Sequence, residues 1–180
     1  MGAYDATFCA WNFSAISRFS QPRAEVEVSF VLGSRLEGPG VTAADVIRAT
    51  DYVVPSIEIV DSRVTDWKIK IQDTVADNAS CGVFVLGDRL VDPRRVDLST
   101  CGMVLEKNGD IACTGAGAAT LGNPVNAVVW LANTLGRLGI PLKAGEVVLS
   151  GSFTRPVAGL KGDSFHADYG PLGSVSFRLA

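Results

Sequence analysis

Hydrophobic and polar residues alternate along residues 22–32 in the way that is typical of a β-strand. Successive side chains of a strand point to opposite faces, so Glu25 and Glu27 share one face and the valines beside them share the other. A strand this apolar is at least half buried, where an unpaired charge is costly. Two interpretations stay open at this point: a pair of ligands for a hard cation, or a solvent-facing sheet edge that carries charge.

A second strand is predicted at residues 53–61, where β-branched residues dominate. Glu58 is flanked by Ile57 and Ile59, so its side chain faces away from both. A third carboxylate therefore projects from an apolar strand. This favours the cation-ligand interpretation of Glu25 and Glu27.

The remaining pattern predicts one long helix, a short helix and several more strands. Asn123 suits the N-cap of the long helix and Pro124 suits its first turn. Apolar residues then recur on one face until Gly136 or Gly139. A shorter helix begins after Thr42. Strands are expected at 82–86, 101–107, 110–114, within 143–152, at 165–169 and at 173–179, with a hairpin turn at 108–109, and residues 67–71 also alternate.

Two further stretches carry polar groups that could contact a ligand. Asp77, Asn78 and Ser80 are interspersed with small residues, which let a backbone approach a ligand closely. A capped turn has the same composition, so this assignment stays open. Ser150 and Ser152 follow a predicted buried strand, where hydroxyls and amides could hold an anion or form a simple strand-ending turn.

Composition narrows the class of protein. The 180 residues are 47% hydrophobic and 19% charged, which is enough for one substantial core. The net charge of −3 and the isoelectric point near 5.1 give no electrostatic footprint for nucleic acid or an anionic membrane surface. No apolar run reaches the length of a membrane span. We therefore expect a soluble cytoplasmic protein that binds neither nucleic acid nor membrane.

The cysteines and the single histidine limit the chemistry further. No Cys-x-x-Cys pair occurs, and His166 is the one imidazole, so a zinc site of thiolates and imidazoles lacks ligands. A Ser-His-Asp mechanism would have to rest on His166, which has no nucleophile-elbow motif to serve. We predict reduced, buried thiols rather than disulfides at Cys9, Cys81, Cys101 and Cys113.

Six segments in the same order resemble a known enzyme family. They are residues 21–27, 58–63, 66–82, 114–119, 123–126 and 143–152. Together they are similar to the 2-keto-4-pentenoate (2-hydroxypenta-2,4-dienoate) hydratases of aromatic meta-cleavage pathways, within the fumarylacetoacetate hydrolase superfamily. The segment DWKIKIQDTVADNASCG at 66–82 looks like the hydratase branch. The related 4-oxalocrotonate decarboxylases differ more in that segment.

The resemblance implies a fold and a metal site. The fold is α+β, with a mixed rolled β-sheet of the fumarylacetoacetate hydrolase C-terminal type and one long covering helix. This catalytic domain would span residues 21–180, after a divergent or truncated N-terminal arm at 1–20. The family's metal ligands correspond to Glu25, Glu27 and Glu58. Such a set of carboxylates suits Mg²⁺ or Mn²⁺.

The activity implied is hydration of 2-hydroxypenta-2,4-dienoate to 4-hydroxy-2-oxopentanoate, with a proton added at C5 and water at C4. Asp77, Asn78 and Ser80 would position substrate or water, and Ser152, with Ser150, would bind the substrate carboxylate. Two alternatives stay open. The same metal site could serve a 4-oxalocrotonate decarboxylase or an acylpyruvate hydrolase, or the chain could be a non-catalytic metal-binding or assembly subunit.

One departure from the family pattern concerns its active-site lysine. In the family this lysine lies in a Gly-Lys-Lys-Ile-Gly-like segment, and residues 1–20 contain nothing that matches it. We therefore predict metal binding and leave turnover open. The resemblance also implies a homo-oligomer and association with a partner 4-oxalocrotonate decarboxylase.

Overall fold

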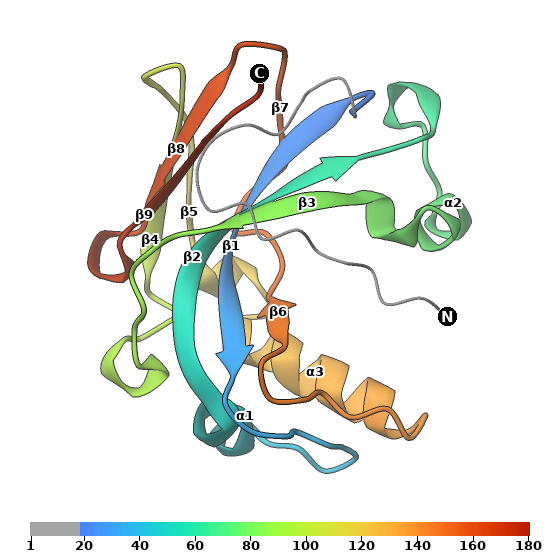
Figure 1. The fold of residues 1–180 in the computed structure, drawn as a ribbon, viewed down its shortest axis with the longest axis vertical. Coiled ribbons are helices and arrows are strands. Elements are labelled where there is room, and N and C mark those ends of the chain that lie inside the picture. Colours follow the sequence, from blue (N-terminus) through green and yellow to red (C-terminus); the bar gives the residue numbers. More distant parts are fainter. Residues whose placement is uncertain (1–18) are drawn as a thin grey trace.

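The computed structural model describes residues 19–180, in which the strands form two sheets (Figure 1). The strands are β1 (Pro22–Leu32), β2 (Thr50–Asp61), β3 (Cys81–Leu86), β4 (Gly102–Lys107), β5 (Asp110–Ala116), β6 (Val147–Leu149), β7 (Val157–Ala158), β8 (Ser164–Asp168) and β9 (Ser174–Arg178). One sheet has the order β3-β2-β1-β6, with β7 also paired to β1, and the other has the order β5-β4-β8-β9. All strand pairs within the described residues are antiparallel.

The helices are α1 (Ala43–Ala49), α2 (Ile71–Ala76) and α3 (Pro124–Gly136). Helix α3 is the predicted long helix, and the side chain of its N-cap, Asn123, accepts a hydrogen bond from the Val125 N–H. Its buried face joins the hydrophobic core, and the helix packs against α1 (Figure 1). Among residues 19–180, no helix is long and apolar enough to cross a membrane.

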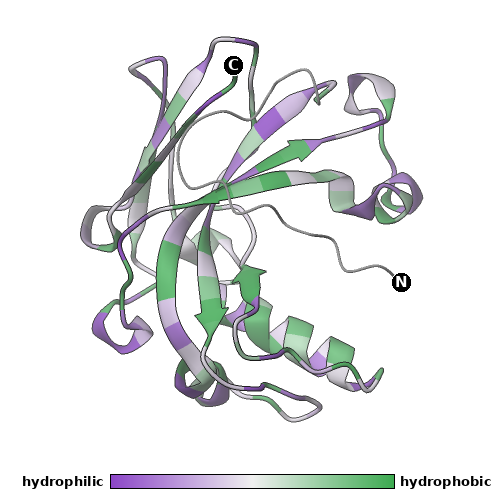
Figure 2. Ribbon diagram, in the orientation of Figure 1, coloured by the Kyte–Doolittle hydropathy of each residue, from purple (hydrophilic) through white to green (hydrophobic). Residues whose placement is uncertain are grey.

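Strand β1 lies inside its sheet, between β2 on one side and β6 and β7 on the other. Val26, Val28 and Phe30 on one face are fully buried, and hydrophobic residues likewise cover most of the central strands in Figure 2. An interior strand has no free edge to protect. The solvent-facing edge interpretation of Glu25 and Glu27 is therefore wrong.

The second sheet confirms the predicted hairpin and the closing pair of strands. The turn between β4 and β5 has positive φ at Asn108 (57°) and Gly109 (89°), which is the conformation that Asn-Gly favours in two-residue hairpins. Between β8 and β9, the rings of Phe165 and Phe177 stack with centroids 4.8 Å apart. The α+β class and the covering helix are thus confirmed, with the strands divided between two antiparallel sheets.

The strand-like alternation at 67–71 does not form a strand. The segment contains a 3-10 turn, Thr65–Trp67, and the start of α2. Helix α2 has only six residues and buries none of them, so no helical period of apolar residues could mark it in the sequence. Cys81, Cys101 and Cys113 are free thiols as predicted, although only Cys101 is buried. Cys9 and the predicted arm at 1–20 lie almost wholly outside the described residues.

Candidate metal centre

Three carboxylates from two neighbouring strands meet at one point. Glu25 on β1 lies directly opposite Glu58 on β2, and Glu27 is two residues further along β1 on the same face. One carboxylate oxygen from each residue lies within 4.8 Å of the other two. The β1–β2 register thus brings together the three residues proposed as metal ligands.

The three carboxylates repel one another in a place where water screens them poorly. Burial, and then the charge of Glu58, raises the pKa of Glu25 to about 7. Burial raises the pKa of Glu27 to about 8, helped by Glu58 and Glu25 and opposed by the Gly151 N–H, whose nitrogen lies 2.8 Å from Glu27 Oε2. Burial also raises the pKa of Glu58, opposed by a hydrogen bond from the Cys81 thiol. Without a counter-charge, the cluster therefore holds protons near neutral pH.

A divalent cation fits this donor set. None of the three carboxylates forms an ion pair with a side chain in residues 19–180, so the described part of the chain offers them no compensating charge. All three donors are hard carboxylate oxygens, which Mg²⁺, Mn²⁺ and Ca²⁺ prefer over the softer nitrogen and sulfur ligands. The charge, spacing and chemistry of the cluster are thus those of a cation site.

The carboxylates line a pocket of about 500 Å³. Its walls also include the apolar side chains of Trp67, Ile69, Leu149 and Pro156. Arg23 is the one cationic side chain among the described residues that line it. The pocket therefore combines charged and apolar side chains, a combination that is typical of small-molecule sites.

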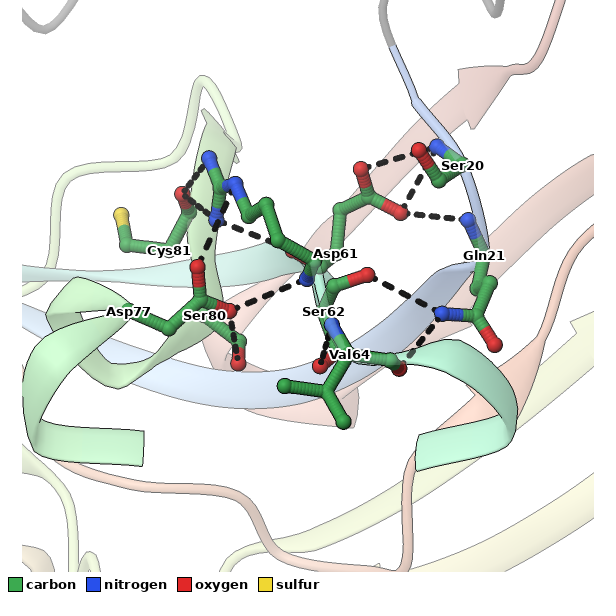
Figure 3. Close-up of polar contacts among 9 residues, drawn as sticks. Ser20, Gln21, Asp61, Ser62, Val64, Asp77, Ser80 and Cys81 are labelled. Atoms are coloured by element: carbon green, nitrogen blue, oxygen red, sulfur yellow. Dashed lines mark hydrogen bonds and ion pairs between the residues drawn. The ribbon is translucent and has the colours of Figure 1, made fainter. Parts of the chain in front are cut away.

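Asp77, Asn78 and Ser80 lie in a turn beside this pocket, and Figure 3 shows the polar contacts of Asp77 and Ser80. The carboxylate of Asp77 accepts hydrogen bonds from the Ser80 hydroxyl (2.9 Å) and the Arg63 N–H (3.1 Å), and it pairs with the Arg63 guanidinium. Burial alone would raise the pKa of Asp77, but these hydrogen bonds and the charge of Arg63 together lower it. Ser80 lines the pocket, whereas Asn78 is exposed outside it.

This turn is held in a strained backbone conformation. Asn78, Ala79 and Ser80 have φ of 53°, 58° and 56°, the left-handed region that non-glycine residues rarely adopt. Such strain persists only where neighbouring contacts hold it, here the contacts of Asp77 with Arg63 and Ser80. The backbone of the turn is thus fixed at the rim of the pocket.

Ser150 and Ser152 flank the pocket residue Gly151 but do not themselves line the pocket. Ser150 is buried, and the Ser152 hydroxyl lies 3.5 Å from the Val26 carbonyl, a long hydrogen bond. Gly151, between them, has φ of 101°, a conformation that suits glycine. Its N–H points at Glu27, so this segment supports a candidate ligand.

Sequence reasoning did not identify Arg23, Trp67 and Gly151 as residues of the pocket. Arg23 carried a usable signal, because the alternation that placed Glu25 and Glu27 on one face also places Arg23 there. No sequence pattern indicated Trp67 or Gly151. Each lies in a connecting segment, and hydrophobic periodicity does not predict the course of such segments.

Comparison with known proteins identifies the family of this chain. The sequence profile of the fumarylacetoacetate (FAA) hydrolase C-terminal family matches residues 10–180. The chain belongs to this family. It is 56% identical over 159 residues to 2-hydroxyhexa-2,4-dienoate hydratase of Comamonas testosteroni, and 69% identical over 120 residues to 2-hydroxypent-2,4-dienoate hydratase of Pseudomonas putida. The predicted family resemblance is confirmed.

These family members are longer than the chain. The matched regions are 88% and 67% of this chain, but 60% of the Comamonas hydratase and 54% of the Pseudomonas hydratase. Among solved structures of the family fold, the chain superposes on 4-oxalocrotonate decarboxylase from Pseudomonas putida G7, complexed with magnesium and adipate, with a TM-score of 0.90 and 41% identity. That match covers 94% of this chain and 64% of the decarboxylase.

Proposed function

We propose that the chain is a divalent-metal-dependent hydratase that converts 2-hydroxypenta-2,4-dienoate to 4-hydroxy-2-oxopentanoate. The observation that carries the proposal is the meeting of Glu25, Glu27 and Glu58 in a half-buried pocket with apolar walls. The hydratase names of relatives at 56% and 69% identity support this reaction over others that use a similar site. The proposal concerns the chain itself, which matches about 60% or less of those relatives.

In this proposal Glu25, Glu27 and Glu58 hold Mg²⁺ or Mn²⁺. The decarboxylase of the same fold, complexed with magnesium, supports the class of metal. A divalent cation supplies Lewis-acid polarisation to the oxygens of a chelating 2-oxo acid. Glu27 is fixed by the Gly151 N–H, and Glu58 by the Cys81 thiol, so two of the three ligands are oriented before metal arrives.

The other residues of the pocket bind and orient the substrate. Trp67, Ile69 and Leu149 pack against its carbon chain and exclude bulk water. Ser80 presents a hydroxyl at the rim, where its contact with Asp77 holds it in position for a water molecule or the substrate. Asn78 stays a proposed contact from the exposed side of the turn, and Ser150 and Ser152 stay proposed contacts of the substrate carboxylate.

Decarboxylation is the second candidate reaction, because the chain is 41% identical to 4-oxalocrotonate decarboxylase with a TM-score of 0.90. Incubation with 4-oxalocrotonate and a carbon dioxide measurement separate the two activities. The homo-oligomer and the decarboxylase partner stay predictions.

Loss of the dienoate absorbance tests the proposed reaction. With Mg²⁺ or Mn²⁺, the purified chain should consume 2-hydroxypenta-2,4-dienoate and form 4-hydroxy-2-oxopentanoate, and chelation should stop the reaction. Glu27→Gln should lower kcat/KM by roughly 100-fold or more, because it removes a charged ligand. Glu106→Gln, a half-exposed carboxylate on the other sheet, is the matched control and should retain activity. Folded, metal-loaded protein that consumes no dienoate would contradict the proposal.

A further inference from the structure

Tyr169 is a fully buried tyrosine whose side chain reaches the strands that carry the carboxylates. It directly follows β8, and it has 0% of its surface exposed. Its hydroxyl donates a hydrogen bond to the Ser56 carbonyl on β2, with 2.8 Å between the two oxygens. Ser56 is the residue that lies directly opposite Glu27 in the β1–β2 register. Tyr169 therefore contacts the sheet at the cross-strand partner of a candidate metal ligand.

The Tyr169 ring also contacts the connection that holds the Glu27 carboxylate. It lies edge-on to the ring of Phe153, with the ring centroids 6.0 Å apart. The Phe153 N–H donates to the Val26 carbonyl (2.8 Å), which fixes this connection beside β1. In the same connection, the Gly151 N–H donates to the Glu27 carboxylate (2.8 Å). Tyr169 thus packs against both elements that set the position of Glu27.

Tyr169 is itself held in place and stays a hydrogen-bond donor. Its backbone N–H donates to the Gly173 carbonyl (2.9 Å), and the Cys101 thiol lies 3.6 Å from its carbonyl oxygen. Burial, and then the charge of Glu27, raises the pKa of the Tyr169 phenol well above its ordinary value. The hydroxyl therefore keeps its proton at neutral and mildly alkaline pH, and it can hold Ser56 in one position.

We propose that Tyr169 is a positioning residue that fixes Glu27 in the geometry of a small octahedral cation, and that it thereby favours Mg²⁺ over Ca²⁺ at the site. The inference rests on the proposed function, because it takes Glu25, Glu27 and Glu58 to hold the metal. Mg²⁺ demands nearly ideal octahedral geometry, whereas Ca²⁺ accepts flexible arrangements of oxygen ligands. Removing a group that orients a metal ligand typically lowers metal affinity by roughly 10- to 100-fold. A less firmly held Glu27 should therefore weaken Mg²⁺ binding more than Ca²⁺ binding.

Tyr169→Phe tests the inference, because it removes the hydroxyl and keeps the ring. Calorimetry at pH 8 measures the dissociation constants of Mg²⁺ and Ca²⁺, and circular dichroism checks the fold. We expect the substitution to weaken Mg²⁺ binding by about tenfold and Ca²⁺ binding by less than about threefold. A merely structural role of the hydroxyl would leave the ratio of the two constants unchanged, because a partly unfolded population lowers both affinities by the same factor.

Tyr52→Phe is the matched control. Tyr52 lies on β2, as Ser56 does, and its hydroxyl forms no hydrogen bond with the described residues. The control should keep the wild-type ratio of Mg²⁺ to Ca²⁺ affinity. Phe153→Leu loosens the second contact of Tyr169 and should shift the ratio in the same direction as Tyr169→Phe. It decides the test if Tyr169→Phe does not fold.

An unchanged ratio in folded Tyr169→Phe, or an equal change in Tyr52→Phe, would overturn the inference. If wild type also turns over the dienoate, that result contradicts the inference alone. A shifted ratio in a chain without dienoate turnover supports the inference and contradicts only the proposed reaction. Failure of wild type to bind either ion would contradict both.

Discussion

At the scale of single residues, the candidate site is a place where the folded chain is less stable than it could be. Glu25, Glu27 and Glu58 all have a raised pKa, chiefly because burial removes water from their charged forms. Groups with these properties cluster at functional sites, since a fold gains nothing in stability from them. This free-energy cost of burying the carboxylates disappears when a bound cation compensates their charges.

Glu27→Gln should therefore stabilise the metal-free protein in a pH-dependent way. The folded-state pKa of Glu27, about 8, exceeds its ordinary value of 4.5, so the folded state binds more protons between these values. The free energy of unfolding of metal-free wild type should fall as pH rises from 5 to 8. The neutral variant should fall less, and at pH 8 it should be more stable by roughly 1–4 kcal/mol.

Urea denaturation at pH 5, 6, 7 and 8 with a chelator present measures this difference. Glu106→Gln removes a carboxylate from β4, on the other sheet, and should reproduce the wild-type dependence on pH. If Glu27→Gln were less stable than wild type at pH 8, the Glu27 carboxylate would be a group that stabilises the fold rather than a metal ligand that destabilises the metal-free protein.

At the scale of elements, the site depends on how β1 and β2 pair. Alternation along each strand was enough to predict which carboxylates share a face with one another, because the side-chain period of a strand is two. It was not enough to predict that Glu25 lies opposite Glu58, because register depends on the connection through α1 and on burial of both strands. Before the structure, only the family resemblance implied that Glu58 shares a metal site with Glu25 and Glu27.

For the segment between β2 and β3, the sequence indicated candidate residues but not their positions. Its polar residues could be identified as candidates, yet their placement depends on the ion pair of Arg63 with Asp77 and on three consecutive left-handed residues. Neither feature follows from propensity, since most residues avoid that conformation. The sequence therefore indicated which residues surround the pocket without indicating that Ser80 lines it and Asn78 does not.

Asn133 joins helix α3 to the loop that precedes α1. Its side-chain oxygen accepts from the N–H groups of Gly40 (2.7 Å) and Val41 (2.9 Å), and its amide donates to the Val41 carbonyl (2.9 Å). Asn133→Ala should lower the free energy of unfolding by about 1–3 kcal/mol and the Tm by roughly 2–8 °C. Calorimetry measures both.

Thr134→Ala is the control for that substitution, because its hydroxyl forms no hydrogen bond with the described residues. It should change the Tm by less than about 2 °C. An Asn133→Ala variant as stable as wild type would mean that apolar packing alone holds the loop on α3.

At the scale of the whole molecule, one sheet carries the chemistry and the other completes the core. The ligand candidates and the pocket lie on the sheet built around β1 and β2, while Phe165 on β8 and Tyr169, which directly follows β8, are buried in the shared core. The Tyr169 hydroxyl donates to the Ser56 carbonyl (2.8 Å) on β2, next to the residues that hold the carboxylates. The connection between β8 and β9 thus holds the strand from which Glu58 projects.

The central claim is that carboxylates from two strands form one cation site, and a Mn²⁺ titration tests it most directly. Calorimetry at pH 8 should show one ion bound per wild-type chain, with affinity reduced by roughly a hundredfold in Glu58→Gln and unchanged in Glu106→Gln. Glu58 is the decisive residue because it alone comes from β2. Equal Mn²⁺ affinity in wild type and Glu58→Gln, or no binding by wild type, would contradict the account.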